Sequence, residues 1–149
     1  MRAVVQRVRE ARIEVAGDVI SEMGPGLLAL VGVGGNDGLE QAIEMARKLV
    51  HLRIFDDEDG RMNRSVLDVQ GTLGVVSQFT LYGETSKGRR PSYGGAAGAE
   101  AARPLIEQVA QAARELSVPV VMGRFQADMQ VYLLNDGPVT LWVDTEASK

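Results

Sequence analysis

Cysteine is absent from this chain, and histidine occurs only once, as His51. The lack of cysteine excludes a disulfide framework, a thiolate nucleophile and a Cys-ligated zinc site. His51 is expected at the end of a helix, where a positively charged side chain interacts favourably with the helix dipole. No serine lies in a G-x-S-x-G motif, so a Ser-His-Asp triad is not favoured. The sequence therefore offers no conventional side-chain nucleophile.

Long apolar runs are also absent. The longest strongly apolar run, residues 26–33, is far shorter than the ~20 residues that a membrane-spanning helix needs. Charges interrupt every apolar stretch of the opening segment MRAVVQRVRE, so this segment does not have the pattern of a signal peptide. We therefore expect a cytoplasmic protein with no membrane partner.

Positive charge is in short supply, because the formal net charge is -4 at pH 7. Proteins that hold nucleic acid non-specifically are usually basic overall, so any RNA contact should depend on a local patch and a shaped pocket. A chain of 149 residues, of which 45% are hydrophobic, can bury a core of its own. No repeat, linker or low-complexity tract divides it, and we predict a single domain over residues 1–149.

Short strands dominate the predicted fold, together with two helices. Asp37 is expected to cap the first helix, which continues to Val50. Pro104 lies near the first turn of the second helix, residues 99–116, where proline is best tolerated. Because most connections are short, we predict a mostly antiparallel, barrel-like sheet in an α+β protein. The predicted strands are 2–8, 11–15, 19–23 (joined to the preceding strand by a hairpin at 16–18), 27–33, 52–55, 73–81, 118–125, 129–134 and 139–144.

Two clusters suggest a metal or a cofactor, but their spacing does not support either. The acidic run 56–59 lacks the alternating ligands and distant glutamate of a calcium loop, and a solvated turn is the better interpretation. The glycine-rich segment 34–38 has the outline of a dinucleotide-binding turn between a strand and a helix. Counted from Gly32, however, the sixth position of that fingerprint is Asp37, whose charge would oppose a pyrophosphate. We expect neither a metal nor a cofactor.

Two polar segments at the ends of predicted strands are the remaining candidates for chemistry. Residues 77–82, SQFTLY, end a buried strand and can present hydroxyl and amide groups to a ligand. Residues 135–140, NDGPVT, are expected to form a tight turn between two strands. Taken alone, the first segment could be only a β-prone run, and the second only a hairpin turn.

These two segments resemble the signature motifs of the D-aminoacyl-tRNA deacylases, the D-Tyr-tRNA deacylase family. The segments MRAVVQRV, LRIFDDEDGRMN, KGRRPS and GRFQADM also resemble the family, in the same order. Several ordered matches are more specific than any one motif. The resemblance implies a homodimeric hydrolase that cuts the ester at the 3′ end of D-aminoacyl-tRNA and so proofreads chirality in translation.

The resemblance also implies how the two enantiomers are told apart. In this family the Gly-Pro pair is cis and projects into the partner's active site, which would make Gly137 and Pro138 the chirality filter. A rigid wall can exclude an L-residue by steric clash. Glycine has no side chain to clash, so glycyl-tRNA mischarged on tRNA-Ala is expected to be a substrate as well. Arg7 is expected to brace the Gly-Pro loop.

Catalysis in such a site would depend on positioning, and the resemblance implies that the tRNA's terminal 2′-hydroxyl assists the attack. Thr80 and the backbone amides of Phe79 and Thr80 are assigned to the reacting carbonyl. Gln78 and Ser77 should position the terminal adenosine. Further expected contacts are Phe125 and Met129, which would line the pocket, and Lys87, Arg89 and Arg90, which would contact phosphates.

Two departures from the family's usual sequence concern the fit of the adenosine. Gln126 stands where a small residue is expected, and the loop carries Tyr93-Gly94-Gly95 and Gly98 in place of the usual residues. Two other classes of function remain as alternatives. An oxidoreductase built on residues 34–38 would bind NAD(H), and a non-catalytic RNA-binding module using KGRRPS would bind RNA with an affinity that falls steeply with salt.

Overall fold

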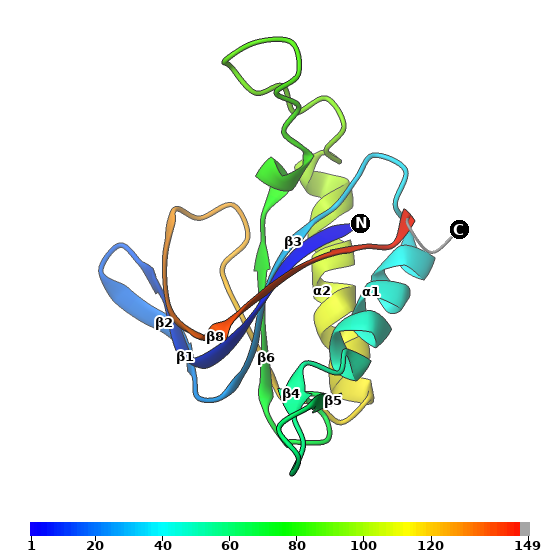
Figure 1. The fold of residues 1–149 in the computed structure, drawn as a ribbon. Coiled ribbons are helices and arrows are strands. Elements are labelled where there is room, and N and C mark those ends of the chain that lie inside the picture. Colours follow the sequence, from blue (N-terminus) through cyan, green and yellow to red (C-terminus); the bar gives the residue numbers. More distant parts are fainter. Residues whose placement is uncertain (147–149) are drawn as a thin grey trace.

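A six-stranded mixed sheet and two long helices make up the larger part of the molecule (Figure 1). The computed structural model describes residues 1–146. The strands β4 and β5 form a separate two-stranded sheet. The elements are β1 (Arg2–Val15), β2 (Asp18–Met23), β3 (Gly26–Gly32), α1 (Leu39–His51), β4 (Phe55–Asp56), β5 (Met62–Arg64), β6 (Thr72–Ser77), the 3-10 helix η1 (Phe79–Tyr82), α2 (Ala99–Glu115), β7 (Val120–Met122) and β8 (Met129–Asp144).

The long strand β1 is the centre of the antiparallel part of the sheet. It pairs with β2 and β3 along one edge and with β8 along the other. The predicted hairpin after β1 is present, and its turn residues Ala16 and Gly17 have φ values of 51° and 84°. Such positive values give a two-residue turn the twist that a hairpin needs. The separate strands predicted at 2–8 and 11–15 are in fact one continuous strand.

The other half of the sheet is parallel, so the prediction of a mostly antiparallel sheet needs correction. The strands β3 and β6 pair in parallel, as do β6 and β7. A parallel pair needs a crossover connection, usually through a helix. The chain supplies one each time, because α1 lies between β3 and β6 and α2 lies between β6 and β7. The predicted connections were taken to be short, and these two are not.

The sheet curls until its ends approach each other, which gives the barrel-like shape that was predicted. The hydroxyl of Ser21 in β2 donates a hydrogen bond of 2.6 Å to the carbonyl oxygen of Met122 in β7. Residues of one buried cluster, including Ile13, Leu28 and Val76, fill the space inside the curl. The strand β1 supplies Val8, Ala11 and Ile13 to this cluster.

The two helices lie side by side and cover the outer face of the parallel strands (Figure 1). Each helix buries an apolar stripe, represented by Met45 and Leu49 in α1 and by Ile106 and Val109 in α2. These side chains belong to the main buried cluster together with Leu73 of β6. Within residues 1–146, no helix is long and apolar enough to cross a membrane.

The two helices lie where they were predicted, but the capping residue and the place of the proline differ from the prediction. The N-cap of α1 is Gly38 and not Asp37. Asp37 instead accepts a hydrogen bond of 2.6 Å from the backbone amide of Gly34, and its other oxygen lies 2.8 Å from the amino group of Met1. Pro104 lies inside α2, beyond its first turn. Asp37 therefore closes the turn after β3, which leaves its carboxylate occupied by the protein itself.

Candidate active site

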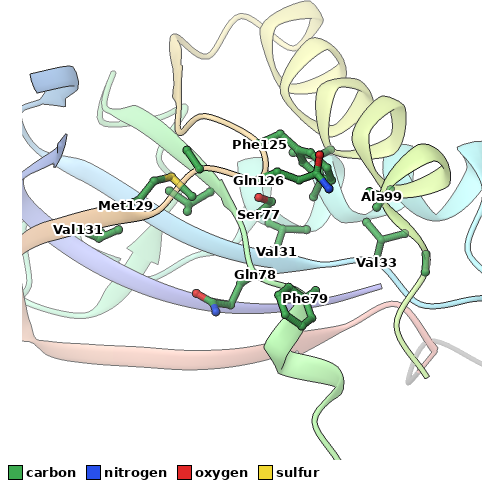
Figure 2. Close-up of a pocket in the computed structure, with 15 residues that line it drawn as sticks. Val31, Val33, Ser77, Gln78, Phe79, Ala99, Phe125, Gln126, Met129 and Val131 are labelled. Atoms are coloured by element: carbon green, nitrogen blue, oxygen red, sulfur yellow. The ribbon is translucent and has the colours of Figure 1, made fainter. Parts of the chain in front are cut away.

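A pocket of about 500 Å³ lies where β3 and β6 end and α2 begins (Figure 2). Its size is that of an ordinary small-molecule site. Most of its wall is apolar, and the only polar side chains are Ser77, Gln78 and Gln126. The apolar lining residues are Val31, Val33, Val76, Phe79, Ala97, Ala99, Ala102, Ile106, Phe125, Ala127, Met129 and Val131.

The segment SQFTLY changes conformation within the pocket wall. The strand β6 ends at Ser77, and the 3-10 helix η1 begins at Phe79. The predicted strand 73–81 is therefore too long at its carboxyl end. Gln78 lies between the two elements with φ -146° and ψ 79°. The Nε2 atom of its side chain donates a hydrogen bond to the hydroxyl of Thr80. Ser77, Gln78 and Phe79 line the pocket, whereas Thr80 lies beside it, bonded to Gln78.

The backbone amides of Phe79 and Thr80 open η1 and have no acceptor within it, because the first amides of a helix lack intrahelical partners. In the described part of the chain neither amide donates to a backbone carbonyl outside η1. The neighbouring backbone amides are occupied, since that of Gln78 donates to the carbonyl oxygen of Val31 and that of Leu81 donates to the carbonyl oxygen of Gln78. Two adjacent free N–H groups beside an apolar pocket can stabilise a developing negative charge on oxygen.

Packing against β3 and β1 holds η1 in place. A Cβ atom added at Gly32 would lie 2.8 Å from the carbonyl oxygen of Gln78, so the close approach of η1 to β3 requires glycine there. Arg2 of β1 donates to the carbonyl oxygen of Leu81 at 3.2 Å, and its guanidinium lies 4.4 Å from the ring centre of Tyr82.

Tyr82 links η1 to the turn after β3. Its hydroxyl donates to Asp37 at 3.4 Å. Burial raises the pKa of the Tyr82 hydroxyl well above its ordinary value, and the negative charge of Asp37 raises it further. The phenol therefore stays neutral over the whole physiological range and acts as a fixed donor.

The connection between β7 and β8 forms the opposite wall. Phe125, Gln126 and Met129 all line the pocket, and Figure 2 places Phe125 and Gln126 against α2. Gln126 has a φ of 62°, in the left-handed region that non-glycine residues rarely adopt. This conformation gives a physical reason for the small residue expected at this position.

The predicted phosphate contacts lie outside the pocket. Lys87, Arg89 and Arg90 are exposed in the loop 83–98, which projects from the end of the molecule near η1 (Figure 1). Within residues 1–146 none of the three takes part in an ion pair. The base of the loop is tied to the site, because Tyr93 packs its ring edge-on against Phe79 with centroids 5.1 Å apart.

The segment NDGPVT does not form the predicted turn between two strands. It lies within β8, which pairs with β1 on both sides of it. Asn135 is opposite Val8 and Thr140 is opposite Gln6, so β8 advances five residues where β1 advances two. The chain keeps its direction, and the extra residues bulge out of the sheet. A sharp turn was predicted because Asn, Asp, Gly and Pro favour both turns and bulges.

The tip of this bulge is the Gly137-Pro138 pair. Its peptide bond is cis, and both residues are exposed. Neither residue lines the pocket beside η1. Arg7 lies beneath the bulge, only 8% exposed, and donates to the carbonyl oxygens of Asp136 at 3.2 Å and Ile54 at 2.7 Å. The structure thus fixes the base of the bulge and leaves its tip free.

The residues that the sequence did not favour lie away from the pocket. His51 is the last residue of α1 and does not line the pocket. In the acidic run, Asp57 accepts the backbone amides of Arg61 and Asp59, which lower the pKa of its carboxyl group. Residues 1–146 contain no group of three His, Cys, Asp or Glu side chains arranged to hold a metal ion.

Sequence reasoning missed much of the pocket wall. Val31 and Val33 were assigned only to a buried strand, and the alanines at 97, 99 and 102 were assigned only to a loop and a helix. A signal was present in AAGAEAA at 96–102, since small side chains at the start of a helix leave room for a ligand.

Comparison with known proteins gives one consistent family. The sequence model described as D-Tyr-tRNA(Tyr) deacylase matches residues 4–144. The D-aminoacyl-tRNA deacylase of Thermosipho africanus is 50% identical over 146 residues, covering 98% of each chain. That of Chloroflexus aurantiacus is 54% identical over 145 residues, covering 97% of this chain and 91% of the relative.

Two solved structures share the fold. The c-Myc DNA Unwinding Element Binding Protein superposes with a TM-score of 0.92 at 38% identity, covering 97% of this chain and 99% of the other. A probable eukaryotic D-amino acid tRNA deacylase superposes with a TM-score of 0.82 over 95% and 97% of the two chains. At 15% identity this second likeness concerns the fold alone.

Proposed function

This chain belongs to the D-Tyr-tRNA(Tyr) deacylase family, and from that premise we propose that it removes D-amino acids from tRNA in the cytoplasm as a proofreading step of translation. It is a hydrolase acting on aminoacyl-tRNA esters. The observation that carries the proposal is the pair of free backbone amides at Phe79 and Thr80 beside a pocket of about 500 Å³.

The pocket is proposed to take the terminal adenosine of the tRNA. Its apolar walls suit the faces of a purine, and Phe125 and Met129 offer an aromatic and a polarisable surface to it. Ser77 and Gln78 lie on the wall nearest to η1 (Figure 2) and can bond the ribose and orient it. In the proposed pose the 3′ oxygen, which carries the amino acid, would lie next to Phe79 and Thr80.

In the proposed reaction water attacks the ester carbonyl carbon, and the oxyanion that forms is held by the amides of Phe79 and Thr80. The terminal 2′-hydroxyl of the tRNA assists by relaying the proton of the attacking water. The carbon–oxygen bond to the ribose then breaks, the 3′ oxygen takes the proton, and free amino acid and tRNA leave. The position of His51, outside the pocket, supports a mechanism without a side-chain base.

Selection of the D-enantiomer is proposed to depend on a second copy of the chain. The exposed tip at Gly137 and Pro138 lies outside the pocket of its own chain, so a homodimer is needed to bring it to a partner's pocket. There the tip would bind the substrate's ammonium through its carbonyls and would clash with an L side chain. Arg7 holds the bulge from below. Glycine, including glycine mischarged on tRNA-Ala, would pass this filter.

The basic loop is proposed to contact the tRNA backbone. Lys87, Arg89 and Arg90 are exposed in the projecting loop 83–98 and are free of ion pairs in the described residues. Guanidinium and ammonium groups bind phosphates without regard to base sequence. This arrangement supports RNA binding by a protein whose net charge is -4.

The proposal is tested by measuring ester loss from D-Tyr-tRNA, L-Tyr-tRNA and Gly-tRNA-Ala. We expect the D and glycyl esters to be cleaved and the L ester to survive. Thr80→Ala removes the hydroxyl that accepts a hydrogen bond from the Gln78 side chain, and it should lower the rate on the D ester. His51→Ala should leave that rate unchanged. Equal rates on the D and L esters would exclude the filter, and loss of turnover in His51→Ala would indicate a side-chain base.

A further inference from the structure

A second, smaller cavity lies behind the candidate pocket. It has a volume of about 250 Å³ and shares Ser77, Ile106 and Phe125 with the larger pocket. The Phe125 side chain therefore stands between the two spaces. The remaining walls of the smaller cavity come from Val75, Arg103, Glu107, Met122, Gly123 and Arg124.

The smaller cavity differs from the larger one in its charge. Two arginines and one glutamate line it, whereas no charged side chain lines the larger pocket. Arg103 and Arg124 are both exposed, and within residues 1–146 neither makes an ion pair or a side-chain hydrogen bond. The cavity thus combines an excess of positive charge with donors that the protein does not use.

The Arg103 side chain has a defined place despite its exposure. Its guanidinium carbon lies 4.8 Å from the ring centre of Phe125, close enough for a cation–π interaction. A guanidinium stacked on a ring keeps its edge N–H groups available, and their planar fork matches the oxygens of a phosphate. Phe125 thus has the apolar pocket on one side and, on the other, a guanidinium whose N–H groups suit a phosphate.

We propose that Arg103 and Arg124 bind the phosphate that joins the terminal adenosine to the preceding nucleotide of the tRNA. This inference rests on the proposed function, because it assumes that the adenosine occupies the larger pocket. In an adenosine whose 3′ oxygen faces Phe79 and Thr80, the 5′ oxygen leaves the opposite side of the ribose. The smaller cavity adjoins the larger pocket at Ser77 and Phe125 and offers that 5′ phosphate a cationic site.

The two arginines have a different task from the loop. Lys87, Arg89 and Arg90 lie in the projecting loop 83–98 and line neither cavity, so we assign them to phosphates farther along the tRNA. Arg103 and Arg124 line the smaller cavity, which adjoins the pocket, and in our proposal they bind a single phosphate. They should therefore matter even for the shortest substrates that contain this phosphate.

Three substrates separate these contributions: the D-Tyr esters of adenosine, of the dinucleotide cytidylyl-adenosine (CpA), and of intact tRNA. We expect Arg103→Ala and Arg124→Ala each to raise KM about tenfold on the CpA ester and on tRNA, as for a charge-assisted hydrogen bond. On the adenosine ester, which has no phosphate, KM should not change, and kcat should stay constant throughout. Arg103→Lys should lose part of the effect, because it keeps the charge and loses the planar fork.

Arg47→Ala is the matched control, since Arg47 is an exposed arginine of α1 outside both cavities. It removes the same charge and should leave all three KM values unchanged. An equal rise in KM on the adenosine ester would show that Arg103 and Arg124 only support the pocket wall and would overturn the proposal. Unchanged KM values on all three substrates would overturn it as well.

Binding without chemistry keeps this inference separate from the proposed function. Calorimetry with unesterified CpA and with adenosine should show tighter binding of CpA to the wild type, with the advantage lost in Arg103→Ala. If the wild type cleaves no ester but this difference is found, the proposed function fails and the phosphate site stands. If the wild type cleaves D esters but binds CpA no better than adenosine, the phosphate site fails alone.

Discussion

The segments SQFTLY and NDGPVT carry the clearest likeness to the family, yet the structure treats them in opposite ways. SQFTLY turns from β6 into η1 at the wall of a pocket that a single chain completes. NDGPVT bulges from β8, and its exposed tip does not line this pocket. One segment lines a cavity, and the other lies exposed at the surface. The difference is the structural basis for proposing that two chains cooperate.

Both regions are nevertheless held by the same strand. Arg2 of β1 donates to the carbonyl oxygen of Leu81 in η1, and Arg7 of β1 donates to that of Asp136 in the bulge. The two arginines are five residues apart, so they leave opposite faces of the strand. A change in either arginine should therefore affect one region without the other.

The largest effect is expected where η1 approaches β3. Gly32→Ala would place a Cβ atom 2.8 Å from the carbonyl oxygen of Gln78 and must displace the backbone that carries the free amides. We expect kcat/KM on D-Tyr-tRNA to fall about a hundredfold, as when an oxyanion donor is lost. Gly35→Ala is the control, because its Cβ would meet nothing closer than 3.9 Å. A fully active Gly32→Ala would mean that η1 is not where the ester binds.

A smaller effect, on selectivity, is expected from the support of the bulge. Arg7→Met removes the donors to Asp136 and Ile54 and leaves two carbonyl oxygens without them. Such a loss costs about 1–3 kcal/mol in stability. The ratio of D to L rates should fall about tenfold if ~1.4 kcal/mol of it reaches the filter, while the rate on the D ester changes less. Arg47→Ala removes an exposed arginine of α1 that makes no ion pair within residues 1–146, and it should keep the ratio.

The smallest effect is expected at a turn that belongs to neither region. The Asp68 carboxylate accepts the backbone amide of Ser65 at 2.9 Å, which lowers the pKa of Asp68. The stabilisation that this bond gives is therefore present above about pH 4 and is lost as the pH falls through the lowered pKa. Asp68→Asn should melt slightly earlier than the wild type at neutral pH, and the difference should vanish in acid. Selectivity and rate at neutral pH should not change.

Sequence patterns predicted the local structure better than the connections. The alternation in β1 and the turn at Ala16-Gly17 were sufficient for a hairpin, because both depend on neighbouring residues. The parallel pairing of β3 with β6 was missed, since it depends on contacts between segments far apart in the chain.

For the candidate site, the residue types did not indicate the shapes of the two segments. Nothing in SQFTLY shows that the strand gives way to a 3-10 helix after Gln78, which is decided by the close approach to Gly32. Nothing in NDGPVT shows that the chain continues in the same direction, which depends on pairing with β1 along both halves of β8.

The central claim is that the pocket of one chain works with the Gly137-Pro138 tip of another, and mixing two variants tests it directly. Gly32→Ala displaces the backbone that carries the amides of Phe79 and Thr80 and keeps the tip, whereas Pro138→Ala keeps the pocket and removes the ring from the tip. Pro138→Ala alone should cleave both D-Tyr-tRNA and L-Tyr-tRNA. The Pro138→Ala protein is then mixed with an excess of the Gly32→Ala protein so that subunits exchange between the dimers. In this mixture cleavage of the L ester should disappear while cleavage of the D ester persists. Cleavage of the L ester that stays unchanged at every mixing ratio would contradict the account.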